Sequence, residues 1–535
     1  MRFMKIYNYI SMLFLAATVT FASCSQNEEL GGENMEAMQG FQINVFDDGF
    51  QDVEANKTRA IENNYTTRFA EGDAIGIFAV KGEAVVGEIN NRKFTMQDGI
   101  WTLDDDGDPI EYKGSEYQKM NFYAYYPFDK NVVFDPTKAE PFETYINNWK
   151  VGNDQSEGEY TKYDLMISTG VVDGDRLKGK ISFAMKHQMA LAVIQMPKLV
   201  YAFTNANVDD YALPVTVGSF TLNNAEAIPY YQESTDTYRF LVNPKKDFSI
   251  KGTYDGVKEM EYTAGGTLDG GTARMYTIND PNKIDFTLAV GDYFCADGRI
   301  VNKGTEPIPD NVVGIVCYVG NPQPSITHPE NNTETNDALR RDYPDCKHGL
   351  VLALNNTSES TGKFSSWRDT GSAYCDWFSK DEDWIDKFVD CNTLNSSTLW
   401  ENKYPAFMGY NNTMLLTMCY EGKGTQTMCD DAYNQISAYR NSVAVPDSST
   451  PWYLPSISCL AQVAGNLMTV NSSLGKVAGA TEMQSVAANS NSGFYWSSTL
   501  RNGYTTWVHG MDGGSFNKSN SYGSIPGYFR MMLAF

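Results

Sequence analysis

Histidine and cysteine side chains are the first candidates for chemistry in this chain of 535 residues, because they supply nucleophiles, general bases and metal ligands. The sequence holds four histidines, and none stands in a nucleophile motif or at zinc-ligand spacing from cysteine. The acidic run at 104–108 offers oxygen ligands, but Pro109 stands where a calcium loop of the EF-hand type requires glycine. We therefore predict no catalytic residue, no metal site and no cofactor.

Two of the histidines, His187 and His348, lie beside apolar, strand-like segments and are interpreted as structural residues. The acidic run at 104–108 lies between strand-like segments and is interpreted as a turn. Cysteine is then the remaining residue type whose chemistry the sequence could use.

Cys24 directly follows a segment, residues 1–23, with the features of an export signal: a positive start, a short apolar run and two small residues. The apolar run is shorter than the ~20 residues that a membrane-spanning helix needs. The pattern resembles a bacterial lipobox, in which the cysteine thiol is acylated and becomes the new N-terminus. We expect lipid on Cys24 to hold the protein on the outer membrane, and residues 24–40 to form a polar tether. A plain signal peptide with an incidental cysteine is the alternative.

The other cysteines all lie after residue 285, and their even number in an exported protein suggests disulfides. The sequence does not choose among the pairings, and free buried thiols remain the alternative. The same asymmetry predicts a domain boundary near residue 285. The disulfide candidates are Cys295, Cys317, Cys346, Cys375, Cys391, Cys419, Cys429 and Cys459.

The formal net charge is −24, from 66 acidic and 42 basic residues. A nucleic-acid-binding surface needs clustered Lys and Arg, so we predict no nucleic-acid partner.

Period-2 alternation of apolar and polar residues recurs from residue 41 to 285, with Gly, Asp and Asn turns between the short segments. This pattern is typical of β-sandwiches and barrels. We place one sandwich at 41–197 and a second at 198–285.

Four segments in this region, TRFAEGDAIGIFAV, MNFYAYYPF, YDLMIS and ISFAMKHQMALAV, occur in the order in which they occur in the fimbrillin-like pilins of Bacteroidetes. Residues 41–285 resemble that family. The resemblance implies a mainly β fold with two transthyretin-like β-sandwiches.

In that family an arginine-specific protease cuts the loop after the first strand, and a strand from the next subunit replaces the released one by β-augmentation. By this resemblance the cleavage site falls between Arg59 and Ala60, with Arg68 as the rival position. An ordinary exposed arginine is the alternative.

Residues 286–535 have a different composition, with most of the tryptophans and frequent Gly, Ser and Asn. Their WYLPS and YWSST segments and closing Arg-containing strand resemble a C-type-lectin-like module of the kind shared with formylglycine-generating enzymes. The resemblance implies an α+β fold. Apolar spacings of three and four predict helices at 376–390, 430–443 and 458–470.

Residues 500–528 are rich in Tyr, Trp, Asn, Ser and Gly, the residues of adaptable recognition loops. Aromatic faces also stack on sugar rings. The alternative is that the tryptophans here belong to the core. The ligand-contact candidates are Asn502, Tyr504, Trp507, His509, Asn517 and Tyr522.

Together these features predict a tip fimbrial adhesin, first an outer-membrane lipoprotein and then part of a cell-surface fimbrium. Its expected partners are a stalk or adaptor fimbrillin subunit and a carbohydrate or protein ligand on a host or neighbouring cell. The first alternative is a non-polymerising surface lipoprotein that binds glycans. The second is an enzyme of the formylglycine-generating type, although no late cysteine pair is present.

Overall fold

The computed structural model describes most of the chain, and the structural statements below refer to the described residues. These are 42–53, 65–110, 119–168, 180–278, 282–329, 332–357, 386–389, 407–422, 430–486, 492–502, 505–512, 516–520 and 527–535.

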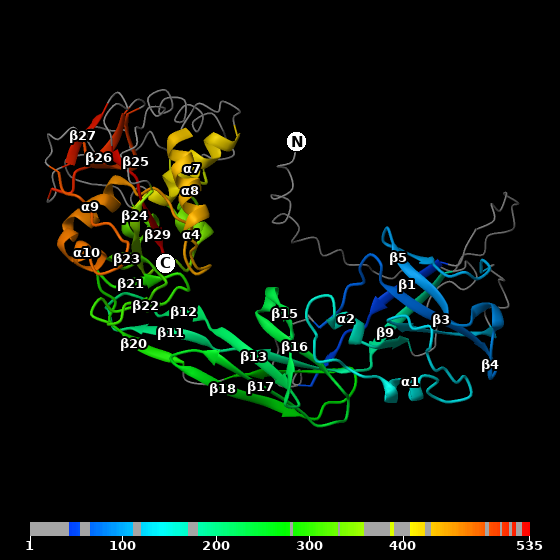
Figure 1. The fold of residues 1–535 in the computed structure, drawn as a ribbon. Helices are drawn as coiled ribbons and strands as arrows, with labels where there is room; N and C mark the ends of the chain where they lie inside the picture. Colours follow the sequence, from blue (N-terminus) through cyan, green and yellow to red (C-terminus); the bar gives the residue numbers. More distant parts are fainter. Residues whose placement is uncertain are drawn as a thin grey trace, which may run out of the picture. The chain divides into compact units, whose positions relative to one another are not determined.

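Two compact units make up the described chain (Figure 1). The first comprises 42–51, 65–150 and 164–189, and the second comprises 52–53, 151–163 and the chain from 190 onward. The predicted boundary at 197 differs from this division, because the strand that begins at residue 190 pairs within the second unit.

One mixed sheet forms the first unit, with strand order β1-β9-β8-β7-β3-β5-β6 and β4 added on β3. Its end strands, β1 and β6, lie near each other, so the sheet curls around a single apolar core. Its elements are β1 (Gln42–Asp47), β3 (Ala74–Lys81), β4 (Ala84–Val85), β5 (Arg92–Gln97), β6 (Ile100–Leu103), β7 (Asn121–Tyr126), α1 (Glu143–Asn148), β8 (Met166–Ser168) and β9 (Lys180–His187).

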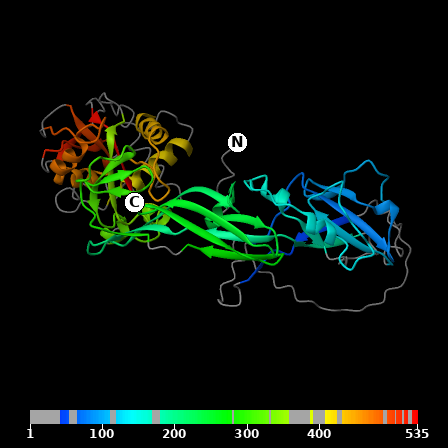
Figure 2. The same ribbon diagram turned by 60° about the horizontal axis from the view of Figure 1, so that its bottom comes forward.

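A β-sandwich begins the second unit, with sheets β15-β16-β10-β19-β2 and β14-β13-β17-β18 (Figure 2). Alternate residues of β10 and β16 meet residues of β13, β17 and β18 in one core, as the period-2 pattern predicts. The elements are β2 (Gln51–Asp52), α2 (Tyr160–Tyr163), β10 (Ala190–Gln195), β13 (Thr216–Leu222), β14 (Ala225–Ala227), β15 (Tyr230–Gln232), β16 (Thr237–Val242), β17 (Phe248–Asp255), β18 (Glu259–Gly266) and β19 (Thr272–Thr277).

A three-stranded sheet, β12-β11-β20, shares its core with the C-terminal residues. It consists of β11 (Lys198–Phe203), β12 (Tyr211–Pro214) and β20 (Lys283–Phe286). The hydroxyl of Tyr201 accepts a hydrogen bond from the backbone N–H of Ile300 at 3.1 Å, and the hydroxyls of Tyr211 and Ser448 lie 2.9 Å apart. The predicted boundary at 285 therefore runs through a shared core.

The C-terminal part, which begins with β21, is α+β. Its sheets have the orders β22-β21-β23-β24-β29 and β27-β26-β25-β28. Its strands are β21 (Tyr293–Cys295), β22 (Ile300–Val301), β23 (Val312–Val319), β24 (Gly349–Asn356), β25 (Phe494–Asn502), β26 (Thr505–His509), β27 (Phe516–Asn520), β28 (Gly527–Tyr528) and β29 (Arg530–Ala534). Its helices are α3 (Pro324–Thr327), α4 (Ala338–Asp342), α7 (Gly409–Gly422), α8 (Asp430–Ser442), α9 (Ile457–Gly465) and α10 (Leu467–Leu474).

The helix predictions met three outcomes. The helix expected at 430–443 is α8. The helix expected at 458–470 is two helices, because the chain leaves helical geometry at Asn466, which closes α9. The helix expected at 376–390 lies almost entirely outside the described residues, and α7 was not predicted because its first turn, GYNN, has the composition of a loop.

Four of the eight disulfide candidates are free thiols, which corrects that prediction for them. All four are buried, and Cys317 donates from Sγ to the carbonyl oxygen of Leu350 at 3.3 Å. They pack as small apolar residues of the C-terminal core. Disulfides remain a prediction for Cys375, Cys391 and Cys429, which lie outside the described residues, and for Cys419, whose side chain is not described. The four free thiols are Cys295, Cys317, Cys346 and Cys459.

The shared core predicts that a cavity made in β12 loosens strands far along the chain. Leu213 is buried in that core, so Leu213→Ala should destabilise it by about 2–5 kcal/mol. Hydrogen-exchange mass spectrometry should show faster exchange in β23 and β24. The matched control is Leu222→Ala, which makes the same change in the sandwich core and should loosen β17 first. Unchanged exchange in β23 and β24 of Leu213→Ala would mean that the C-terminal part folds independently.

Candidate functional site

The strand β1 occupies one end of the first sheet and has a single strand partner there, β9. The two strands pair in parallel, with Ile43 opposite Ile181 and Val45 opposite Phe183. These side chains belong to the apolar core, whereas Phe46 on the other face is exposed. β1 thus covers the apolar core with one face, and its other face is exposed to solvent.

A buried ion-pair cluster fixes the end of β1. The imidazole of His187, at the end of β9, lies between two carboxylates: Nε2 is 2.9 Å from Oδ1 of Asp47, and Nδ1 is 2.8 Å from Oδ1 of Asp164. All three side chains are almost completely buried. Asp47 is the last residue of β1, so this trio, here termed the clasp, joins β1 to the body of the sheet.

The clasp keeps its histidine charged. Burial alone would lower the pKa of His187, but the carboxylates of Asp164 and Asp47 outweigh burial and raise that pKa to about 9. Burial would likewise raise the pKa of Asp47, but the hydrogen bond and charge of His187 bring it below its usual value. His187 is therefore structural, as predicted, and it also carries a buried positive charge beneath β1.

The chain beyond β1 is anchored to the same place. The ring of Phe50 stacks on the imidazole of His187, with ring centroids 3.7 Å apart. The backbone N–H of Phe50 donates to the carbonyl oxygen of Tyr65 at 3.1 Å, and the backbone N–H of Thr67 donates to Asp47. Phe50 and the chain from Tyr65 are thus held to the first unit, whereas Val53, directly before segment 54–64, donates its backbone N–H to the carbonyl oxygen of Ala273 in the second unit at 3.0 Å.

The predicted cleavage residues, Arg59 and Ala60, lie within segment 54–64, outside the described residues. The rival, Arg68, is exposed, but its neighbours are held in place. Thr67 is bonded to Asp47, and Phe69 makes edge contacts with Trp101 and Tyr126. A protease must extend several residues on each side of the bond that it cuts, so Arg68 is poorly placed.

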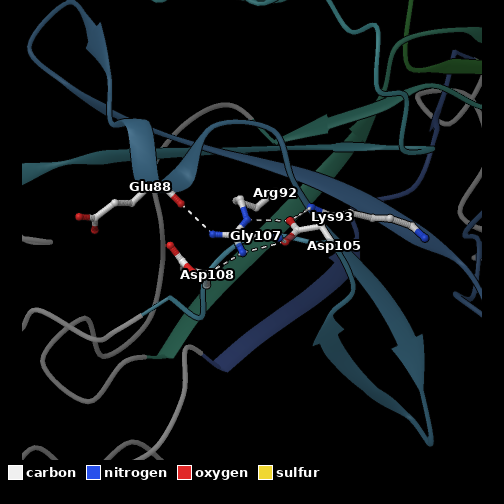
Figure 3. A network of polar contacts seen from close by, with 6 residues as sticks. All are labelled: Glu88, Arg92, Lys93, Asp105, Gly107 and Asp108. Atoms are coloured by element: carbon white, nitrogen blue, oxygen red, sulfur yellow. Dashed lines mark hydrogen bonds and ion pairs between the residues drawn. The ribbon is translucent and has the colours of Figure 1, made fainter.

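The acidic run at 104–108 is a turn fixed by arginine (Figure 3). The guanidinium of Arg92 donates to both carboxylate oxygens of Asp105, at 2.7 and 2.8 Å, and to the carbonyl oxygens of Glu88 and Asp108. Gly107 packs against this guanidinium, where a Cβ would lie 2.9 Å from it. The hydrogen bond from Arg92 lowers the pKa of Asp105, and both oxygens of this carboxylate accept hydrogen bonds within the turn.

Two of the ligand-contact candidates in the C-terminal part are interior residues, which corrects their assignment to an exposed surface. Trp507 is 8% exposed and His509 is fully buried on β26, which lies between β25 and β27. Burial lowers the pKa of His509 to about 4, so it is neutral. Tyr504 and Tyr522 lie outside the described residues, and the side chains of Asn502 and Asn517 are not described.

Within the described ranges, no group of three or more His, Cys, Asp or Glu side chains is arranged to hold a metal ion. None of the helices there is long and apolar enough to cross a membrane.

The clasp was missed by sequence reasoning. Its residues stand 117 and 23 positions apart in the chain, as the differences between positions 47, 164 and 187 give, and no local motif joins them. The pairing of β1 with β9 brings Asp47 to His187, and the pairing of β8 with β9 brings Asp164 there.

Comparison with known proteins places these features in context. A family model described as "Fimbrillin-like" matches residues 58–292. A Bacteroides ovatus protein named "Putative fimbrium tip subunit Fim1C" is 33% identical over 536 aligned residues, covering 94% of this chain and 95% of that protein. The crystal structure of a fimbrial protein from Bacteroides ovatus is similar with a TM-score of 0.59 and 29% identity, covering 93% of this chain and 99% of that one.

The clasp predicts that stability falls as the pH rises. The pKa of His187 is raised from 6.5 to about 9, so its stabilisation is complete below pH 6.5 and is lost as the pH rises through 9. We expect the free energy of unfolding of the first unit to fall by up to about 3 kcal/mol between pH 6.5 and 9.5. The measurement is urea unfolding at each pH. The fraction of molecules with an unfolded first unit is then determined from a hydrogen-exchange pulse in β9, which is applied at one fixed pH so that the intrinsic exchange rate stays constant.

The matched pair Asp47→Asn and Asp48→Asn provides the control, since Asp48 is the exposed neighbour of the same charge. Asp47→Asn should destabilise the first unit and flatten the pH profile, whereas Asp48→Asn should change neither. Equal profiles for the two variants would contradict the role of the clasp.

Proposed function

Because the chain belongs to the fimbrillin-like family, we propose that it is a tip subunit of a surface fimbrium that accepts a strand from its neighbour in place of β1. The observation that carries the proposal is an asymmetry between the two ends of the described chain. β1 is an end strand with one strand partner, whereas β29 is enclosed in the C-terminal core.

The acceptor role is supported by what β1 covers. Loss of β1 would expose the edge of β9 with its unpaired backbone groups, and would uncover Ile181, Phe183 and Met185. Buried backbone groups need hydrogen-bond partners, and an open strand edge recruits another strand. An incoming strand would recover both the backbone bonds and the apolar contacts.

The inference that β29 is not donated to a neighbouring subunit is supported by its burial. All residues of β29 and the following Phe535 are buried. Arg530 is fully buried and donates to the carbonyl oxygens of Ala353, Leu354 and Thr481. The backbone of Phe535 is bonded to His348. Withdrawal of β29 would break the hydrogen bonds that Arg530 donates and would expose the C-terminal core. We therefore infer that this strand stays in its own subunit and that the protein occupies the tip of a fimbrium.

Protease maturation at Arg59 is the step that would release β1. Before it, we expect the protein to be held on the outer membrane through lipid on Cys24, and after it, to sit on the fimbrium. The expected partner at β1 is a stalk or adaptor fimbrillin subunit.

The C-terminal part is the proposed adhesive part, by its resemblance to C-type-lectin-like modules. Its ligand, a carbohydrate or a protein, would meet the surface around Asn502, Tyr504, Asn517 and Tyr522, with Trp507 and His509 as interior supports. A glycan-binding lipoprotein that does not polymerise is the competing function, and it predicts retained lipid and an uncut Arg59. A formylglycine-generating activity is disfavoured by the burial of the four described thiols, since burial raises the pKa of Cys295, Cys317, Cys346 and Cys459 and suppresses the thiolate.

Blocking the cut should block assembly. Arg59→Ala should leave the protein folded and in the outer membrane, and should reduce its amount in sheared fimbriae at least tenfold, as measured by quantitative immunoblotting. Arg68→Ala is the matched control and should assemble normally. Normal assembly of Arg59→Ala with loss of Arg68→Ala would move the cut to the rival position, and normal assembly of both would contradict maturation by cleavage at either arginine.

The surface candidates should affect ligand binding without affecting the fold. Tyr504→Ala and Tyr522→Ala should weaken adhesion of the assembled fimbrium to target cells, with unchanged thermal unfolding. Trp507→Ala should instead lower the stability of the C-terminal part by about 3–5 kcal/mol, because it removes a buried aromatic side chain. Undiminished adhesion in both tyrosine variants would exclude this face as the ligand surface.

A further inference from the structure

The surface that β1 covers carries a fixed chemical pattern. Three alternate residues of β1 face inward: Ile43 and Val45 meet the apolar core, and Asp47 meets the charged imidazole of His187. β1 runs parallel to β9, and every second residue of β1 faces inward. Along the chain these inward residues are apolar, apolar and acidic.

Departure of β1 would take one of the two carboxylates that flank His187. Asp164 precedes β8 and would remain at Nδ1, while Nε2 would lose its contact with Asp47. A buried donor left without a partner is destabilising, and more so when it is charged. A charged acceptor makes a hydrogen bond to imidazolium roughly twice as strong as a neutral one does.

Of the two adjacent aspartates, only Asp47 contacts His187. Asp48 stands next to Asp47 but is exposed, and its backbone N–H donates to the carbonyl oxygen of Met185. A negative charge at position 48 would therefore meet solvent, whereas a negative charge at position 47 meets His187.

We propose that the strand from the neighbouring subunit that replaces β1 is selected by this groove and carries a carboxylate at the position of Asp47, on the face that also bears two apolar residues. This inference rests on the strand replacement proposed above and specifies the partner of that site. His187 then acts as the specificity residue of the groove: it favours an acidic strand and disfavours one that would bury an apolar or basic side chain against its charge.

The test uses three synthetic peptides of residues 42–53, with a fluorophore at the C-terminus: the natural sequence, Asp47→Asn and Asp48→Asn. The two variants have the same composition and net charge and differ only in the position of the change. The full-length protein, nicked within 54–64 by an arginine-specific protease, is incubated with each peptide. Uptake is followed by fluorescence anisotropy and by intact mass of the displaced segment.

We expect the natural and Asp48→Asn peptides to replace β1 with affinities within about twofold of each other, and Asp47→Asn to bind at least tenfold more weakly. Equal uptake of all three peptides would overturn the selection by His187 and leave strand replacement standing. Uptake of none would overturn strand replacement itself, and the inference with it.

A protein variant provides a second check. His187→Gln removes the buried charge and should bind the natural and Asp47→Asn peptides equally. Persistent preference of His187→Gln for the natural peptide would contradict the assigned role. If this variant does not fold, the peptide series on the unchanged protein still decides the question.

Discussion

The parallel pairing of β1 with β9 is the constraint on which the first unit depends. β9 holds apolar residues that need cover, an edge that needs hydrogen bonds and a histidine that needs a second carboxylate. One short strand satisfies all three needs. Because these needs persist when the strand leaves, the same features that stabilise the unit before cleavage would drive the binding of a replacement strand afterwards.

The clasp would also allow the proposed site to be both stable and exchangeable. Buried ion pairs contribute little net stability compared with apolar packing, but removing one partner is costly. In the proposed exchange, such a pair would discriminate strongly among candidate strands while adding modestly to the affinity for any one of them. Apolar residues at the positions of Ile43 and Val45 would supply affinity that many strands could match, and a carboxylate at the position of Asp47 would supply the discrimination.

At the other end of the chain, the sheet β12-β11-β20 of the second unit joins the C-terminal part through a common core. The sheet β12-β11-β20 belongs by sequence to the region resembling pilins, but its Tyr201, Tyr211 and Leu213 pack with residues after 290. A C-terminal part that shares a core with this sheet would pass tension to it directly.

Much of this was predictable from local pattern. The alternating segments became strands, and α8 appeared where spacing predicted it, because such signals lie within a few neighbouring residues. The clasp, the shared core and the burial of Trp507 depend on which distant strands pair, so they could not be predicted from composition. The four free thiols show the same limit, since an even count of cysteines says nothing about whether two of them meet.

The proposed release and replacement of β1 is tested most simply by the N-terminus and intact mass of the protein in sheared fimbriae and in outer membrane. We expect molecules in fimbriae to begin at Ala60 and lack lipid, and uncut molecules in the membrane to begin at an acylated Cys24. Fimbrial molecules that retain residues 42–59 and the lipid would contradict the proposed release.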